Sequence, residues 1–366
     1  MGEDELIEAL DGVDLLGVRS RTQVTPKVVA ERGETLTAVG AFCIGTNQLA
    51  LDDLAHAGVA AFNAPFSNTR SVVELVISEI IALARRLGDR NTQMHHGVWR
   101  KSAIGSHEVR GRTLGIVGYG NIGAQISVLA EALGLSVMYY DVADKLPMGN
   151  AHRCDSLEEL LQSVDVVTVH VDGRADNKLL FGEQEFSMMR PRSLFLNLSR
   201  GHVVDVAALA DNLRTGHLAG AAVDVYPSEP RSGDEPFVSE LQSLDNVILT
   251  PHVGGSTQEA QIDIGRYVAG KLIDYSERAS TSMSVNLPDI TTGATPGARI
   301  GHLHLNMPGI MADLNRLVAD HGGNVTYQAL ATRGELGYTV LDIDETDREL
   351  LVDVTRLEGT IRARVL

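Results

Sequence analysis

The chain has 366 residues and a formal net charge of −17, from 31 Lys and Arg against 48 Asp and Glu. This acidity argues against a nucleic-acid backbone as the main partner, because phosphates bind where positive charge is concentrated. No stretch approaches the ~20 consecutive apolar residues of a membrane helix, and no targeting segment is apparent, so we expect a cytoplasmic protein without membrane contact. The two cysteines, Cys43 and Cys154, are too few for a disulfide framework or a cysteine-based zinc site, and we predict no metal site.

The first 67 residues contain three short strand–helix steps, with strands predicted at 14–18, 36–42 and 59–63, each followed by polar residues. Such steps are typical of a parallel α/β sheet. From Ser71 the sequence changes character. Ser71 to Glu74 matches a capping box, and an apolar stripe with helical spacing continues to Leu87, which predicts one long helix.

Six strands that alternate with helices are predicted between residues 113 and 250, at 113–117, 135–140, 164–171, 193–198, 218–225 and 246–250. A long helix follows at 256–278, and the last segment has the order β-α-β-β-α-β, typical of a self-contained ferredoxin-like module. We therefore expect an α/β protein with a discontinuous substrate-binding domain (1–67 and 251–287), a dinucleotide-binding domain (68–250), a linker (288–298) and a C-terminal domain (299–366). Both larger domains are expected to be doubly wound, the first flavodoxin-like and the second of the Rossmann type.

The strongest motif is the G-x-G-x-x-G run of Gly118, Gly120 and Gly123, which joins a predicted strand to a predicted helix. Gly118 permits the tight turn, Gly120 lets the backbone approach a pyrophosphate, and Gly123 allows the helix and the strand to pack closely. Asp141 follows the next strand and can accept hydrogen bonds from the ribose hydroxyls of NAD, while it would repel the extra phosphate of NADP. The alternative is a glycine-rich turn in another α/β protein.

Three residues after strand ends downstream of this loop are candidates for chemistry. Arg200 can grip a carboxylate with two hydrogen bonds, His252 can take and return a proton, and Glu229 can orient that imidazole and stabilise its charged form. Each has a simpler explanation alone: a helix-end contact, a turn residue and a solvated charge. Their joint position after successive strands favours an active site.

Several cations and polar residues lie outside the predicted cofactor half, and together they form a candidate anion site in an acidic chain: Arg19, Arg21, Asn68, Arg70 and Lys101. Ordinary surface charge explains them equally well. Trp99, the only tryptophan, is predicted to be either a core residue or an interface anchor.

With these residues in view, the chain resembles the D-2-hydroxyacid dehydrogenase family along essentially its whole length, and within it the branch with a C-terminal ACT regulatory domain. The resemblance is carried by the runs at 19–22, 43–48, 62–71, 118–123, 199–201, 218–225 and 250–260. It implies that Arg200, Glu229 and His252 are the catalytic residues. It also implies cofactor contacts by Gly118, Gly120, Asn121, Ile122, Gly123, Asp141, Leu198, Ser199, Asp224, Gly254 and Gly255, and substrate contacts by Arg19, Ser20, Arg21, Asn68 and Lys101.

In this branch the ACT domains pair across subunits of a homotetramer and bind L-serine, which the resemblance places near His304, Asn306 and Asn324. Met307 stands before Pro308-Gly309 where the family more usually has arginine, so one charge is missing beside the predicted effector site. Relatives also have about 40 residues before the point where this chain begins, containing a further strand and helix. We therefore expect the substrate-binding domain to be incomplete at its N-terminus.

The resemblance implies NAD-dependent oxidation of 3-phosphoglycerate to 3-phosphohydroxypyruvate, the entry to serine synthesis, and some relatives also reduce 2-oxoglutarate. One alternative is the same chemistry on glycerate, lactate or another 2-hydroxy acid, for which the cations Arg19, Arg21 and Lys101 would be unnecessary. Another is a non-enzymatic NAD sensor that acts through partner proteins, as some relatives of this fold do. The intact set of Arg200, Glu229 and His252 favours an enzyme.

Overall fold

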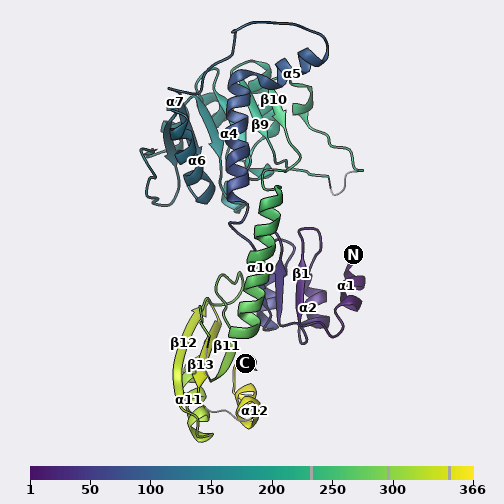
Figure 1. Cartoon of the computed structure of the whole chain (residues 1–366), viewed down its shortest axis with the longest axis vertical. Coiled ribbons are helices and arrows are strands. Elements are labelled where there is room, and N and C mark those ends of the chain that lie inside the picture. Colours follow the sequence, from purple (N-terminus) through teal and green to yellow (C-terminus); the bar gives the residue numbers. More distant parts are fainter. Residues whose placement is uncertain (231–233, 295–296, 345–347) are drawn as a thin grey trace. The chain divides into compact units, whose positions relative to one another are not determined.

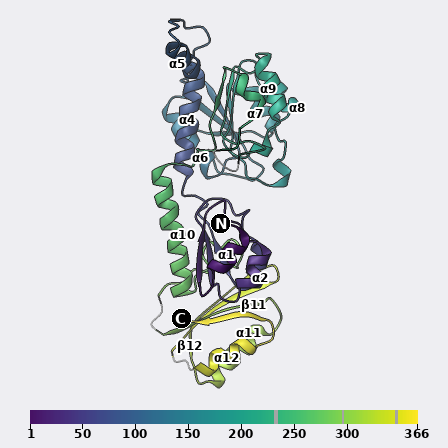
Figure 2. The same ribbon diagram turned by 90° about the vertical axis from the view of Figure 1, so that its right-hand side faces the viewer.

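The computed structural model describes residues 1–230, 234–294, 297–344 and 348–366, so residues 295–296 of the predicted linker lie outside the described part. The chain divides into two compact units: Asn68–Ala260, and Met1–Ser67 together with Gln261–Leu366 (Figures 1 and 2). The finer division into substrate-binding, linker and C-terminal parts stays a prediction. Over the described residues, no helix is both long and apolar enough to cross a membrane.

The unit Asn68–Ala260 contains a seven-stranded parallel sheet with the strand order β10-β9-β8-β7-β4-β5-β6. The central strands are apolar and buried almost throughout, as expected for parallel strands covered on both faces. The sequence predicts six of the seven strands; β6 was missed because it has only two residues, both exposed. The strands are β4 (Thr113–Val117), β5 (Ser136–Tyr140), β6 (His152–Arg153), β7 (Val166–Val169), β8 (Leu194–Asn197), β9 (Gly220–Val223) and β10 (Val247–Leu249).

Helices cover both faces of this sheet (Figure 2), which confirms the predicted doubly wound Rossmann fold. Helices α4 and α6 share one apolar core with the sheet, and α7, α8 and α9 share the core on the opposite face. The helices are α4 (Thr69–Arg85), α5 (Leu87–His95), α6 (Asn121–Ala132), α7 (Leu157–Ser163), α8 (Glu183–Met188) and α9 (Val206–Arg214), with short 3-10 turns η1 (Ala175–Asn177), η2 (Gly201–Val203) and η3 (Glu240–Ser243).

The prediction of one helix that starts with a capping box at Ser71 was wrong at both ends. The N-cap of helix α4 is Asn68, three residues earlier, and the Ser71 hydroxyl bonds the Thr257 hydroxyl at 2.8 Å instead of capping the helix. At the other end, Arg86 adopts a left-handed conformation (φ 52°) and separates α4 from α5. Helix α5 was not predicted because none of its residues is buried, so it carries no apolar stripe.

The first 67 residues form a three-stranded parallel sheet, β1-β2-β3, as the strand–helix steps predicted. The long helix α10 packs on this sheet at Gly40, where a Cβ would lie only 2.6 Å from Val268 Cγ1. The elements are α1 (Glu3–Ala9), β1 (Leu15–Val18), α2 (Pro26–Arg32), β2 (Ala38–Ala41), α3 (Leu51–His56), β3 (Ala60–Phe62) and α10 (Gln258–Arg278).

The C-terminal segment has the predicted β-α-β-β-α-β order and forms a four-stranded antiparallel sheet, β12-β13-β11-β14. One apolar core lies between this sheet and its two helices. This confirms the ferredoxin-like fold. The elements are β11 (Ala298–Leu305), α11 (Ile310–Asp320), β12 (Val325–Arg333), β13 (Leu336–Ile343), α12 (Arg348–Arg356) and β14 (Thr360–Val365).

The module has its own core, and the other face of its sheet also shares a core with the N-terminal sheet and α10. Leu303 and Tyr338 belong to the same buried cluster as Phe62 and Leu272. The Tyr338 hydroxyl donates to the Ala279 carbonyl at 2.9 Å. The module therefore packs within the unit that contains the N-terminal sheet.

Candidate active site

The three glycines of the turn after β4 are glycine for different structural reasons. Gly118 has φ +91°, and a Cβ there would lie 2.6 Å from the carbonyl oxygen of His170. Gly123 is buried, and a Cβ there would collide with the carbonyl oxygen of Gly118. In contrast, apart from its chain neighbours, no heavy atom of the described residues lies within 4 Å of the position of a Cβ at Gly120. Gly118 and Gly123 are thus required by the packing of the chain itself, while Gly120 leaves open space beside the start of α6.

The first turn of α6 faces that space. The helix begins at Asn121 after Gly120, which offers no side chain to cap the first amides. Uncapped N–H groups at a helix N-terminus favour a negatively charged group. Asn121 is exposed, and Ile122 is half-buried against the core, so its side chain anchors the turn.

Asp141 lies directly after β5, where the sequence placed it. One carboxylate oxygen accepts the Tyr119 N–H at 2.8 Å and the other accepts the Ala143 N–H at 2.8 Å. These bonds fix the carboxylate, and each oxygen keeps a further lone pair for a ligand hydroxyl. The open space at Gly120, the uncapped helix start and the fixed carboxylate together fit the pyrophosphate and ribose of NAD.

The loop after β8 is held by Asn197, a buried residue that the sequence analysis did not single out. Its side-chain oxygen accepts both the backbone N–H and the hydroxyl of Ser199, at 3.1 and 2.8 Å. Its side-chain nitrogen donates to the Arg200 carbonyl at 3.1 Å. Leu198 and Ser199 are buried, whereas the Arg200 side chain is exposed, with Nη1 donating to the Ser199 carbonyl at 2.7 Å. These hydrogen bonds hold the loop, which presents one exposed guanidinium.

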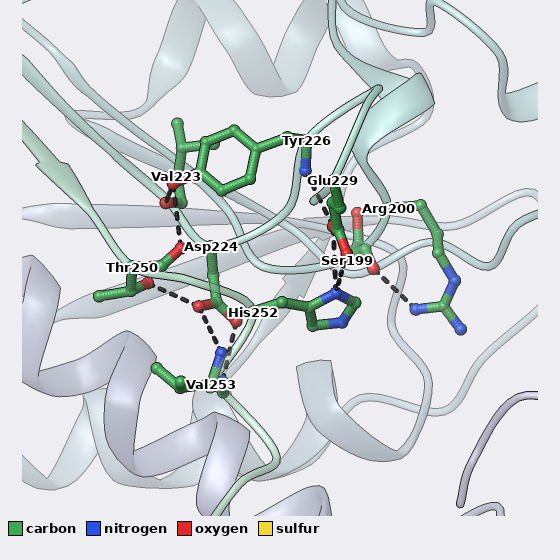
Figure 3. Close-up of polar contacts among 10 residues, drawn as sticks. Ser199, Arg200, Val223, Asp224, Tyr226, Glu229, Thr250, His252 and Val253 are labelled. Atoms are coloured by element: carbon green, nitrogen blue, oxygen red, sulfur yellow. Dashed lines mark hydrogen bonds and ion pairs between the residues drawn. The ribbon is translucent and has the colours of Figure 1, made fainter. Parts of the chain in front are cut away.

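Asp224, at the end of β9, organises the turn that follows β10 (Figure 3). The side chain is 1 % exposed and accepts three hydrogen bonds: from the Thr250 hydroxyl at 2.6 Å, from the Val253 N–H at 2.8 Å and from the Gly254 N–H at 2.8 Å. A buried carboxylate with this number of donors is well compensated. Asp224 therefore holds the Thr250 side chain before His252 and the backbone of Val253 and Gly254 after it.

His252 and Glu229 form the hydrogen-bonded pair expected from the sequence. The Nδ1 of His252 lies 2.8 Å from Glu229 Oε2 and 3.0 Å from Oε1 (Figure 3). Oε1 also accepts the Tyr226 N–H at 3.1 Å, and Tyr226 is anchored by its hydroxyl, which donates to the carbonyls of Val223 and Thr250. His252 has φ +54°, a conformation that a non-glycine residue adopts only where its surroundings hold it.

The tautomer of the His252 imidazole determines which ring nitrogen can accept a proton. An Nδ1–H that donates to the carboxylate leaves the lone pair on Nε2 free to accept a proton. The nearby carboxylate then stabilises the imidazolium that forms. The ring is exposed, so a ligand can reach it. This is the arrangement of a general acid/base.

A second carboxyl group near this site, that of Glu79, falls within the helical apolar stripe predicted between Ser71 and Leu87. Glu79 of α4 is 3 % exposed, and neither of its carboxyl oxygens has a hydrogen-bond partner among the described residues. Burial raises its pKa to about 8, and the negative charge of Asp224 contributes to that rise. Glu79 is therefore protonated at neutral pH.

Of the predicted substrate residues, Asn68 and Lys101 belong to the unit that carries these groups. The Asn68 side chain packs directly on Gly255, where no Cβ would fit. Lys101 is exposed in the segment after α5. Arg19, Ser20 and Arg21 lie after β1 in the other unit and are exposed, with Arg19 donating to the Gln261 side chain at 2.8 Å. Trp99 is 79 % exposed, which excludes the core-residue alternative.

The predicted effector residues are not all at the same end of the C-terminal sheet. His304 and Asn306 lie at the end of β11 where Leu305 pairs with Leu336, and Asn324 precedes β12 at the end where Val325 pairs with Ile343. His304 is buried, with its ring nitrogens bonded to the Leu305 carbonyl and the Thr339 hydroxyl. One chain alone does not bring the three residues together.

Comparison with known proteins agrees with this architecture. Residues 77–254 match the family model of the D-isomer specific 2-hydroxyacid dehydrogenase NAD binding domain, and residues 300–362 match an AHAS small subunit-like ACT domain. The fold resembles the solved structure of D-2-hydroxyisocaproate dehydrogenase with a TM-score of 0.73 and 24 % identity, over 78 % of this chain and 90 % of that one.

Full-length relatives are more similar in sequence. The chain is 48 % identical over 369 residues to D-3-phosphoglycerate dehydrogenase of Escherichia coli K12, covering 100 % of this chain and 90 % of the relative. It is 49 % identical to the Haemophilus influenzae enzyme of the same name, covering 99 % and 89 %. The chain therefore belongs to the D-isomer specific 2-hydroxyacid dehydrogenase family of NAD-dependent enzymes, on the branch that contains these D-3-phosphoglycerate dehydrogenases.

Proposed function

We propose that this protein oxidises 3-phospho-D-glycerate to 3-phosphohydroxypyruvate with NAD, the first step of L-serine synthesis. The observation that carries the proposal is the 2.8 Å pair of His252 and Glu229, in a chain that aligns over its whole length with enzymes named for this substrate. The cytoplasmic location predicted from the sequence is part of the proposal.

Bound NAD would supply the hydride acceptor for C2 of the substrate. The C2 hydroxyl gives its proton to Nε2 of His252, and Glu229 holds the ring and stabilises the imidazolium that results. Arg200 binds the substrate carboxylate and polarises the C2 oxygen. In the reverse direction the imidazolium returns the proton, so one residue serves both directions.

The substrate also carries a phosphate, and cations outside the acid/base pair are available for it. We assign the binding of this phosphate and of the rest of the substrate to Arg19, Ser20, Arg21, Asn68 and Lys101, one of which would come from a neighbouring subunit. The support is chemical: an unphosphorylated 2-hydroxy acid would need no second set of cations, and this chain has an excess of acidic residues elsewhere.

We propose feedback control by L-serine at the C-terminal domain. Because Asn324 lies at the opposite end of the sheet from His304 and Asn306 within one chain, a site that uses all three needs two copies of the domain. A homotetramer built through the dinucleotide-binding and C-terminal domains meets that need. The exposed side chains of Trp99 and Ile104, at 79 % and 82 % exposure, suit burial in such an assembly.

The proposed substrate and the control by L-serine can be tested together. NADH production is measured on 3-phosphoglycerate, glycerate and lactate, with and without L-serine, and NADH consumption is measured on 2-oxoglutarate. We expect turnover on 3-phosphoglycerate to exceed that on the unphosphorylated acids, and serine to lower it. Faster turnover of glycerate or lactate would replace the proposed substrate. No turnover on any acid, by a protein whose circular dichroism shows it to be folded, would favour an NAD sensor.

A further inference from the structure

A cavity of about 230 Å³ lies at the amino ends of the strands of the seven-stranded sheet, on the opposite edge from His252. Its walls come from residues at or just before the starts of six strands and from the C-terminal end of α4. The residues that matter for its chemistry are Arg86, Arg112, Arg192, His107 and Asp165. All of them belong to the unit Asn68–Ala260.

The walls carry three guanidinium groups against one carboxylate, in a chain with a net charge of −17. That carboxylate, Asp165, already has partners outside the cavity. It accepts a hydrogen bond from the Thr113 N–H at 2.9 Å and forms an ion pair with Arg190 at 3.2 Å. Its contact with Arg112 is long, 3.9 Å. The cavity therefore has an excess of positive charge.

Two of the three arginines are held in a conformation that costs free energy. Arg86 has φ +52° and Arg192 has φ +67°, both in the left-handed region that non-glycine residues rarely occupy. At Arg192 a glycine would relieve this strain without loss of a buried contact, since that side chain is exposed. At Arg86 a glycine would also remove the ion pair with Asp89, whose side chain is only 10 % exposed. Arginine at both positions, around one cavity, indicates a use for the guanidinium groups.

Donors remain available for a ligand. Arg86 uses Nε and Nη2 for Asp89, and its Nη1 has no hydrogen-bond partner in the described part of the chain. Arg112 donates through Nε to the Glu108 carbonyl at 3.2 Å, and Arg192 donates through Nη1 to the Gly216 carbonyl at 3.3 Å, so each keeps further N–H groups. The wall at Gly105, which has no side chain, lies beside Arg86 and keeps the space open.

We infer that this cavity is a second anion site, for a small compound that bears phosphate groups. Guanidinium groups bind phosphate oxygens with paired, charge-assisted hydrogen bonds. The volume is below the ~300 Å³ at which pockets for drug-sized ligands begin, so the ligand is closer in size to pyrophosphate or to a phosphorylated three-carbon acid than to a nucleotide. The site is separate from the acid/base pair, and its existence does not depend on the proposed reaction.

The test is calorimetric titration of the full chain with inorganic pyrophosphate at constant ionic strength, with NADH present at saturation so that the glycine-loop site is filled. Arg192→Gly and Arg112→Gln should each weaken binding at least about 10-fold, the effect of losing one charge-assisted hydrogen bond. Arg214→Gln is the matched control, because its guanidinium is exposed, pairs with Asp211 at 2.8 Å and does not line the cavity. The affinity of this control variant for pyrophosphate should stay within about twofold of the wild-type affinity.

Folding does not obscure this test. Glycine suits φ +67°, so Arg192→Gly should melt at the wild-type temperature or above it in buffer without pyrophosphate. Pyrophosphate that binds the wild type and binds both cavity variants with equal affinity would lie elsewhere, and the inference would be wrong. Absence of binding to the wild type would overturn it as well.

Discussion

The two edges of the seven-stranded sheet carry different chemistry for a physical reason. At the carboxyl edge, polar groups are fixed by the chain itself: Asp224 accepts three hydrogen bonds and Glu229 holds the Nδ1 of His252. At the amino edge, the arginines around the cavity have partners for only some of their donors. The first edge is preorganised for a reaction that moves charge, and the second is a surface that an anion would complete.

Glu79 also lies near the carboxyl edge, but its carboxyl group has no hydrogen-bond partner among the described residues. Asp224 and Glu79 are both buried carboxyl groups, but donors surround the first and none among the described residues reaches the second. The difference teaches that burial alone does not decide the charge of an acid: hydrogen-bond donors keep Asp224 compensated, while Glu79 holds a proton instead.

The largest expected effect is at Arg200. Arg200→Gln removes two charge-assisted hydrogen bonds to the substrate carboxylate, so kcat/KM on 3-phosphoglycerate should fall by about 1,000-fold, or about 4 kcal/mol. The measurement is steady-state NADH production. Arg190→Gln, an arginine at the amino edge, should leave kcat/KM unchanged; a comparable loss there would remove the functional distinction between the edges.

The second prediction concerns stability and pH. The folded state raises the pKa of Glu79 from 4.5 to about 8, so folded protein keeps a proton that unfolded protein releases. The free energy of unfolding should therefore fall as pH rises from about 4.5 to about 8, by up to 1.36 kcal/mol for each pH unit. Glu79→Gln has no such proton, and it should be about 3 kcal/mol more stable than the wild type at pH 7.5 and equally stable near pH 4.5.

Urea unfolding across this pH range measures the effect. Glu74→Gln is the matched control, because Glu74 lies on the same helix but is exposed and paired with Arg70 at 2.7 Å. Its stability should follow the wild-type pH dependence. If Glu79→Gln also followed it, Glu79 would be ionised in the folded protein.

The third prediction concerns the partner of the acid/base residue. Glu229→Gln keeps the shape of the side chain but removes the charge that stabilises the imidazolium, so kcat should fall by about 30-fold, or about 2 kcal/mol. The affinity for NADH, measured by fluorescence, should not change. Glu240→Gln, an exposed acid on η3, serves as the control. Retention of wild-type kcat by Glu229→Gln would show that the ion pair is only structural.

The smallest expected effect is at Gly120. A Cβ there would contact no described residue other than its chain neighbours, so Gly120→Ala should fold with an unchanged melting temperature. The added methyl group would occupy the space assigned to the pyrophosphate of NAD, so the Kd for NAD should rise about 10-fold, or about 1.4 kcal/mol. Gly88→Ala, also in open space but on α5, should leave the Kd unchanged. Unchanged NAD affinity in Gly120→Ala would mean that the backbone approaches the cofactor elsewhere.

Much of this fold was predictable because its elements have strong local signals. The buried parallel strands are short apolar runs, and the glycine turn has φ +91° at Gly118, which only glycine adopts without strain. The strand β6 and helix α5 were missed because they bury nothing, and periodicity measures only burial.

The catalytic residues of the site could be predicted from the sequence, but the residues that hold them in place could not. Arg200, Glu229 and His252 were proposed from their positions after strand ends, and the structure brings Glu229 to His252. The contributions of Asn197 and Tyr226 depend on hydrogen bonds to the backbone of neighbouring loops, which have no sequence signature. Glu79 fitted a helical stripe, and its lack of a partner is visible only once the neighbouring elements are in place.

The most direct test of the central proposal is a single-turnover measurement on His252→Gln. The NAD-loaded variant is mixed with 3-phosphoglycerate, and NADH formation is followed by absorbance, alongside the affinity for NADH. His252 should be needed to accept the hydroxyl proton, so NADH formation should slow by at least about 100-fold while NADH affinity stays within about twofold. NADH formation at the wild-type rate would contradict the assignment of the proton transfer to His252.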